Sequence, residues 1–213
     1  RTVVLLVLLT AVVLFATGIA GSSVAALKDL TDTARIALLP GSGWPQQTGV
    51  AELEQMADTC HWIAEKPSRG FRDAIQNFWF YWMMITHGTV PGGRFDQYMY
   101  PYFKADLDKG AITREFAQEL MDCIWVKLND LNKVRDAASA EGFAGYSLFQ
   151  NLIAGGQDIH GLDATNDLSF MCIQASMHVH LPMPSLSVRV WNGSPQDFLM
   201  KAAELTRTGI GLP

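Results

Sequence analysis

The sequence predicts an α/β fold in which helices alternate with short strands. Two observations support this prediction. Several long segments repeat apolar residues three or four positions apart, as helices do, whereas residues 148–154 and 186–190 are short and have the apolar run or two-residue alternation of strands. Glycine- and proline-rich stretches separate these segments. No internal repeat is visible, so we expect one α/β layer architecture over residues 49–213.

The first 48 residues do not fit this pattern. Residues 3–20 are almost all apolar and carry no charge, and the next charged residue after Arg1 is Lys28. An uncharged run of this length suits a membrane-spanning helix, and a signal peptide with an unusually long apolar core is an alternative. A mis-joined or out-of-frame segment explains the run at least as well as an anchor does. The turn-rich residues 40–45 predict a boundary between an N-terminal segment, 1–48, and a body, 49–213.

Two helices are expected next. In residues 50–65 the apolar side chains of Leu53, Met56 and Cys60 share one helical face, with Ile63 close to it. Residues 70–86 form a second helix that is crowded with large apolar groups between positions 78 and 84. A helix that is apolar on every side is normally buried, so we expect core packing there. Residues 87–93 follow as a loop.

A third helix is expected to begin after Thr113, with Thr113 as its N-cap and Glu115 in its first turn. Its predicted apolar stripe consists of Phe116, Leu120, Ile124, Leu128 and Leu131.

The last third of the chain predicts strand, helix, strand and helix in that order. Residues 148–154 form a buried strand that ends in a turn at Gly155 and Gly156. Residues 163–166 cap a helix that runs to about residues 175–178, and residues 186–190 alternate as a strand. Residues 194–197, Ser-Pro-Gln-Asp, predict a capping box with proline at the first helical position, before a helix that ends at Gly209.

Composition excludes several classes of function. Hydrophobic residues make up 49% of the chain and charged residues 17%, which is too apolar for a disordered protein. The net charge is −5 and no cluster of Lys or Arg occurs, so we expect no nucleic-acid partner.

The cysteines point to a reducing compartment. There are three, far apart and without a Cys-x-x-Cys pair, so neither a disulfide framework nor a zinc site is expected. Cys123 and Cys172 fall in apolar helical patterns and are expected to be buried. A cytoplasmic protein fits this usage.

Three polar clusters are candidate sites. His178 and His180 are two positions apart and could place two ligands on one strand face, but no third ligand is evident, so partly buried polar residues are the better interpretation. Asp158, His160 and Asp163 could suggest acid–base chemistry, yet such residues more often bond their own backbone in turns.

Asp96 is the third case. It lies among aromatic residues, so its carboxylate must be paired or protonated. Arg94, two positions away in a segment predicted to be extended, is the expected salt-bridge partner, with a structural rather than a catalytic role.

Separated motifs identify a family. They are Gly-Gly-Arg-Phe-Asp-Gln-Tyr-Met-Tyr-Pro-Tyr at 92–102, Trp-Val-Lys-Leu-Asn-Asp-Leu-Asn-Lys-Val-Arg at 125–135, Gly-Gly-Gln at 155–157, Asp-Ala-Thr-Asn-Asp at 163–167 and Leu-Pro-Met-Pro-Ser-Leu-Ser-Val-Arg at 181–189. In this order and spacing they resemble the large catalytic domain of the glycyl radical enzymes, which include pyruvate formate-lyase (formate acetyltransferase) and the radical dehydratases of anaerobic metabolism. The resemblance covers about residues 50–213 and does not extend to residues 1–48.

The resemblance implies a fold and a reaction class. The family's fold is a barrel of two antiparallel half-sheets surrounded by helices, so the chain is expected to be a fragment of that barrel with an unmatched apolar N-terminal helix. Within the family, residues 151–157 and 189–207 look most like the hydroxyproline dehydratases, with choline lyases, isethionate lyases and pyruvate formate-lyase as alternatives. The resemblance implies that the parent enzyme cleaves a C–O, C–N or C–S bond of a small polar substrate by radical chemistry.

The resemblance also implies pocket residues. Two aromatic positions, Phe143 and Phe149, correspond to the substrate-pocket wall of several members, and the loop with His87 and Thr89 reaches the pocket in the dehydratases. Glycerol-type enzymes have His-Ser where this chain has Gly88 and Thr89, a departure that argues against glycerol as substrate. In the full-length parent a homodimer is expected.

The family's radical groups are not found in this sequence. No cysteine stands in a Gly-Cys-x-Glu loop, residues 205–213 resemble the segment that precedes that loop, and both ends look cut. We therefore expect no catalytic residue, metal or bound cofactor in this chain, and no activity from the chain alone. The protein glycyl radical would lie in the missing C-terminal part, installed by an S-adenosylmethionine iron–sulfur activating enzyme. A membrane-anchored binding protein that uses residues 3–20 is the alternative of another class.

Overall fold

The structure, a computed structural model, describes residues 50–85, 92–130, 137–142 and 150–213. The chain divides into two compact units, one up to Arg69 and one from Gly70 onward. In the first unit, α3 (Val50–Ile63) buries Cys60 and Ile63, and Met56 is half-buried, as the pattern predicts. The predicted boundary between residues 48 and 49, and the predicted apolar helix at 3–20, lie outside the described residues and stay predictions.

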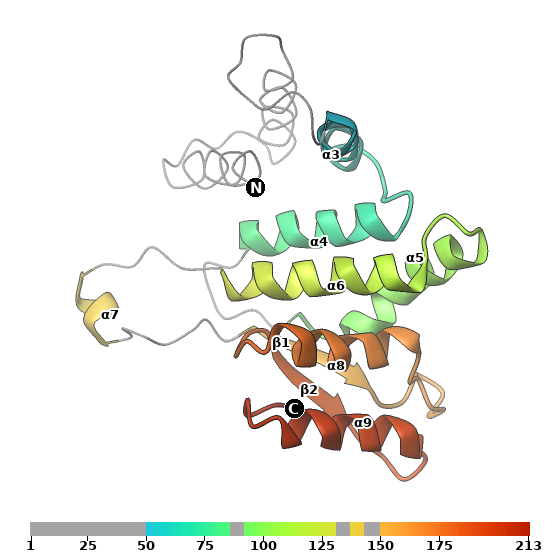
Figure 1. The fold of residues 1–213 in the computed structure, drawn as a ribbon, viewed down its shortest axis with the longest axis vertical. Coiled ribbons are helices and arrows are strands. Elements are labelled where there is room, and N and C mark those ends of the chain that lie inside the picture. Colours follow the sequence, from blue (N-terminus) through green and yellow to red (C-terminus); the bar gives the residue numbers. More distant parts are fainter. Residues whose placement is uncertain (1–49, 86–91, 131–136, 143–149) are drawn as a thin grey trace. The chain divides into compact units, whose positions relative to one another are not determined.

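The second unit contains paired parallel strands, and helices connect them along the chain (Figure 1). Strands β1 (Asn151–Gly155) and β2 (Ser185–Arg189) pair in parallel, and helix α8 (Asp167–Val179) connects them. A parallel pair needs such a crossover, because a tight hairpin can join antiparallel strands only. Gly93 forms a parallel bridge to Leu152 on the other side of β1. Helix α5 (Phe95–Asp108) follows that bridge, and helix α9 (Gln196–Arg207) follows β2.

Helices α4 (Phe71–Ile85) and α6 (Arg114–Asn129) add a further layer, in which α6 packs on α8 and α4 packs on both α5 and α6 (Figure 1). The short helix α7 spans Ala137–Gly142. The core of this unit consists of large side chains that are almost completely buried: Phe71, Phe95, Phe103, Met121, Trp125, Leu128, Leu152, Leu168, Ile173, Leu186, Phe198 and Leu205. The α/β prediction is thus confirmed, whereas the described residues do not test the two-half-sheet barrel.

Two predicted helix faces are partly wrong. Helix α4 is not buried on every side, because Tyr81 is 58% exposed while Trp79, Phe80 and Trp82 are buried. In α6 the core side runs through Ala117, Met121, Ile124, Trp125 and Leu128, which leaves Phe116 39% exposed. The prediction included Phe116 because its side chain is apolar, although Phe116 lies outside the face of α6 that packs on the core.

Two of the predicted helix N-caps are confirmed and one is wrong. Thr113 is the N-cap of α6, and its hydroxyl accepts a hydrogen bond from Phe116 N at 3.1 Å, as expected. Asn166 caps α8 in a complete capping box with Ser169. The predicted capping box of α9 is wrong, because Pro195 occupies the N-cap position and makes no side-chain cap, while the Ser194 hydroxyl accepts from Trp191 N.

No helix within the described ranges is long and apolar enough to cross a membrane.

Replacement of Thr113 by Ala is expected to lower the free energy of unfolding of the second unit by about 1 kcal/mol, because the Phe116 amide then loses its acceptor. Thr113→Ser keeps the hydroxyl and serves as the matched control. Urea unfolding followed by circular dichroism measures both variants; equal losses in Ala and Ser would show that the cap contributes nothing.

Candidate functional site

The carboxyl ends of the parallel strands form the candidate site. In α/β proteins ligands bind at this edge of the sheet, where the loops after the strands meet. Here the edge brings together Arg94 after the Gly93 bridge, Gly155 at the end of β1 with Gly156 after it, and Arg189 at the end of β2. Helices α5 and α8 begin at the same edge.

A buried carboxylate, that of Asp96, organises this edge. Asp96 is completely buried in the first turn of α5. One carboxylate oxygen, Oδ2, accepts hydrogen bonds from Gly155 N at 2.7 Å and from the Ser169 hydroxyl at 2.5 Å. The backbone carbonyl of Asp96 accepts from Asn166 Nδ2 at 3.1 Å. One residue therefore joins the start of α5, the end of β1 and the capping box of α8.

The predicted Arg94–Asp96 salt bridge is wrong. The chain is helical from Phe95 rather than extended, and the Arg94 guanidinium donates instead to two backbone carbonyls, Gln157 O at 2.6 Å and Gly155 O at 2.9 Å. Arg94 still adds a positive charge near Asp96 that favours the ionised carboxylate.

Burial decides the electrostatics of this cluster. Loss of water raises the pKa of Asp96 above its ordinary value of 3.8, and the bonds from Ser169 and Gly155 oppose that change. The other carboxylate oxygen, Oδ1, is buried and has no hydrogen-bond partner among the described residues. Burial, and secondarily the charge of Asp96, also raises the pKa of the Cys172 thiol well above its usual value. Cys172 is thus a protonated core residue rather than a nucleophile.

The turn after β1 requires its two glycines. Gly155 and Gly156 have φ values of +73° and +89°, a region that L side chains rarely adopt. A Cβ on Gly155 would lie 2.5 Å from the Phe198 ring, and one on Gly156 would lie 2.8 Å from Arg189 Cβ. The expected tight turn is confirmed, with a close approach of neighbouring side chains as a second reason for glycine.

The cluster of Asp158, His160 and Asp163 serves the loop that follows. Asp158 Oδ1 accepts from His160 N at 2.8 Å and Leu162 N at 3.0 Å, and these bonds to Leu162 and His160 lower its pKa. Asp163 Oδ1 accepts from the Thr165 hydroxyl and from Trp191 Nε1. The turn interpretation is confirmed for Asp158, because its carboxylate is occupied by backbone groups.

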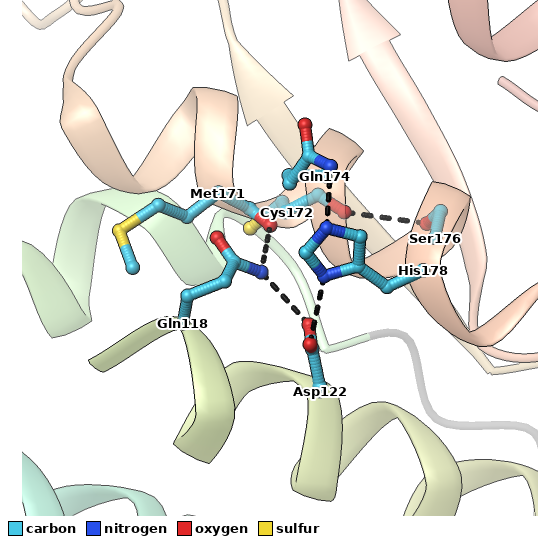
Figure 2. A network of polar contacts seen from close by, with 7 residues as sticks. All are labelled: Gln118, Asp122, Met171, Cys172, Gln174, Ser176 and His178. Atoms are coloured by element: carbon cyan, nitrogen blue, oxygen red, sulfur yellow. Dashed lines mark hydrogen bonds and ion pairs between the residues drawn. The ribbon is translucent and has the colours of Figure 1, made fainter. Parts of the chain in front are cut away.

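A second polar network joins α6 to α8 (Figure 2). His178 Nδ1 lies 2.8 Å from Asp122 Oδ2, and His178 Nε2 lies 2.6 Å from Gln174 Nε2. Gln118 Nε2 donates to Asp122 Oδ1 and to the Met171 carbonyl. The nearby hydroxyl of Ser176 donates to the Cys172 carbonyl and accepts from Trp125 Nε1. The Ser176 hydroxyl is therefore bonded to other groups and not to the His178 imidazole. The network holds α6 against α8.

The partial burial expected for His178 and His180 is wrong, because both residues are exposed, and the strand of the alternative ligand interpretation is absent as well. His178 lies in the last turn of α8, and His180 is the left-handed residue that ends it, with φ +51°. No group of three or more potential metal-ligating side chains occurs in the described part of the chain. The expectation for the cysteines is confirmed for Cys172 and wrong for Cys123, which is exposed on α6 because its helical face turns away from the core.

The four pocket residues taken from the family resemblance, His87, Thr89, Phe143 and Phe149, lie outside the described residues, so their roles stay predictions. The hydrogen bond between Asp96 and Ser169 was not predicted from the sequence either. A partial signal was present in Asn166 and Ser169, whose three-residue spacing suits a capping box, but this spacing does not reveal the distant carboxylate.

Comparisons with known proteins agree with this fold. A family model described as Pyruvate formate lyase-like matches residues 45–213. A solved structure described under 1,2-propanediol dehydration in Roseburia inulinivorans is 57% identical, with a TM-score of 0.80 over 89% of this chain and 23% of the other. The glycerol-bound B12-independent glycerol dehydratase from Clostridium butyricum is 45% identical, with a TM-score of 0.80 over 90% of this chain and 24% of the other.

A curated relative, the isethionate sulfite-lyase of Oleidesulfovibrio alaskensis, is 37% identical over 76% of this chain and 20% of its own length. The hydroxyproline dehydratase structure from Clostridioides difficile is 28% identical, with a TM-score of 0.74 over 87% of this chain and 24% of the other. The glycyl radical resemblance is confirmed, and it extends to several of its dehydratases and lyases. The chain spans about a fifth of the length of the curated relatives it matches.

The raised pKa of Asp96 predicts a pH dependence of stability. The folded state holds the Asp96 proton to a higher pH than the unfolded state does. The contribution of this group is therefore fully present below pH 3.8 and is lost as the pH rises through the folded-state value. From about pH 4 to about pH 7, the wild type should lose more stability than Asp96→Asn, which has no proton to release.

Asp158→Asn is the matched control, because the shift of Asp158 has the opposite sign. Its stabilisation is present above pH 3.8 and is lost only as the pH falls through its lowered pKa. Urea unfolding at several pH values measures all three proteins. An Asp96→Asn variant whose pH profile runs parallel to the wild type would contradict the assignment.

Proposed function

The chain belongs to the Pyruvate formate lyase-like family, and on that premise we propose that it is one portion of a longer glycyl radical enzyme that dehydrates a small vicinal diol. The observation that carries the proposal is the likeness to the 1,2-propanediol dehydration structure, which extends through most of this chain in both sequence and fold. Fold alone would not license a function, but more than half of the aligned residues are identical. Removal of water from 1,2-propanediol gives propanal, so no oxidant or reductant is consumed overall.

In this proposal the chain supplies one wall of the substrate pocket. His87 and Thr89 reach the pocket from the loop before Gly92, and Phe143 and Phe149 form an apolar side of it. Aromatic side chains there would exclude water and shape a small cavity. The described residues next to these positions support a rigid frame, since Gly92 N donates to Asn151 O at 2.7 Å and Ile153 N donates to Gly93 O at 2.7 Å.

The radical groups would come from the rest of the parent polypeptide. The family implies a cysteine that abstracts a substrate hydrogen, a glycyl radical that generates the thiyl radical, and an activating enzyme that installs the glycyl radical with S-adenosylmethionine. None of the three cysteines of this chain lies in a Gly-Cys-x-Glu loop, so we propose that the chain needs those parts for activity. A cytoplasmic homodimer remains our proposal for the full-length parent.

Other substrates define the alternatives. Isethionate, hydroxyproline, choline and pyruvate are each charged, whereas 1,2-propanediol and glycerol are neutral. The Gly88-Thr89 sequence in place of His-Ser still argues for a substrate other than glycerol, although the glycerol dehydratase is similar to this chain. A membrane-anchored binding protein is a weaker candidate, because relatives of residues 45–213 are radical lyases and dehydratases.

The proposal is tested with the full-length parent protein, activated anaerobically by its activating enzyme and S-adenosylmethionine. We expect an electron paramagnetic resonance signal of a glycyl radical, and a kcat/KM for 1,2-propanediol at least about tenfold above those for glycerol, hydroxyproline, isethionate, choline and pyruvate.

The chain of 213 residues, treated in the same way, is the control and should turn over none of these compounds. A higher kcat/KM for any charged substrate would contradict the diol assignment. Turnover by the 213-residue chain alone would contradict the proposed division of the active site.

A further inference from the structure

The two faces of the β1–β2 sheet differ in chemistry. On one face, Leu152, Ala154 and Leu186 are buried beneath helices, since α8 crosses over both strands and α5 and α9 pack beside α8. The residues between them along the strands point the other way. This second face, which we call the open face, consists of Asn151, Ile153, Ser185 and Ser187, all half-buried.

The composition of the open face is unusual for parallel strands. Parallel sheets are normally covered on both sides, and their strands read as nearly continuous apolar runs. Here one amide and two hydroxyls stand on a single face, beside one apolar side chain. An apolar layer packed on this face would bury polar groups whose hydrogen-bonding capacity is only partly used by the bond between Asn151 and Ser187, which is costly. A cavity that holds water or a polar ligand fits these residues better.

One hydrogen bond orients the open face. Asn151 Nδ2 donates to Ser187 Oγ at 2.7 Å across the two strands. The Ser187 oxygen therefore acts as an acceptor toward Asn151, and its own hydrogen remains available to donate. No described residue accepts that hydrogen. Strand register fixes both side chains, because Asn151 lies opposite Ser185 and Ser187 lies opposite Ile153.

Charge narrows the choice of ligand. The four residues of the open face are neutral, and the charged residue at the end of β2, Arg189, lies against Gly156. By the same alternation Arg189 stands at the end of this face, so a sulfonate or a carboxylate could find a counter-ion only there, and no acidic residue of β1 or β2 is available to a quaternary ammonium group. Hydroxyl groups of a neutral molecule can both donate to and accept from serine and asparagine.

Resting on the proposed function, we propose that the open face lines the substrate cavity and that the Ser187 hydroxyl donates a hydrogen bond to a hydroxyl oxygen of the diol. Asn151 acts as a positioning residue, because its amide holds the Ser187 oxygen and directs the free hydrogen away from β1. The bond forms on binding and breaks on release, so it changes affinity without entering the bond-breaking step.

The test uses the full-length parent with 1,2-propanediol. Ser187→Ala should raise KM about three- to tenfold, as expected for one hydrogen bond between neutral groups, and change kcat less. The yield of glycyl radical and the melting temperature should stay at wild-type values. Asn151→Ala should raise KM in the same direction, and Ser187→Thr, which keeps the hydroxyl on a residue suited to strands, should restore it.

Val188→Ala is the control on the neighbouring position of β2, whose side chain points to the helices. It should lower the melting temperature and leave KM unchanged.

An unchanged KM in Ser187→Ala, with normal turnover by the wild type, would overturn this inference and leave the proposed function standing. An equal rise of KM in Val188→Ala would overturn it as well, because the effect would then reflect the fold. Absence of diol turnover in a wild-type enzyme that carries its radical would overturn both proposals together.

Discussion

The second unit of this chain depends on one buried carboxylate. Asp96 joins the first turn of α5 to the end of β1 through Gly155 N, and to the start of α8 through the Ser169 hydroxyl. A buried carboxylate loses its hydration, a cost that is tolerated only when hydrogen bonds replace the lost water. Asp96 also lies near the N-terminal ends of two helices, whose exposed amide dipoles favour negative charge. Loss of these bonds would remove a link that all three segments share.

The hydrogen bonds of Asp96 help to fix the edge of the sheet and the position of its open face. They fix the end of β1, where Gly155 and Gly156 turn the chain closely past Phe198 and Arg189. Because β1 is held at this end, its parallel register with β2 is fixed too, and Asn151 can reach Ser187. The helices then cover one face of the sheet and leave polar side chains on the other. The same constraint thus separates the buried face from the open face, which we propose lines the substrate cavity.

Local signals were sufficient for much of the fold. The Thr113 cap, the two strands and the start of α8 were predicted because each depends on a few adjacent residues. Contacts between distant residues were not: the partners of Asp96 lie 59 and 73 positions away, so Arg94, two positions away, looked like the better partner. Cys123 was misplaced because an apolar pattern shows that a helix has a buried side without fixing its edge. The family followed from motifs, whereas His87, Thr89, Phe143 and Phe149 depend on that resemblance alone.

A double-mutant cycle between Asp96 and Ser169 tests the central claim most directly. The free energy of unfolding is measured at neutral pH for the wild type, Asp96→Ala, Ser169→Ala and the double variant. If the carboxylate binds the Ser169 hydroxyl as described, the stability losses of the two single variants should add up to more than the loss of the double variant. The difference should be about 1 kcal/mol or more. Additive losses, with a coupling energy near zero, would show that the two side chains do not depend on each other and would contradict this account.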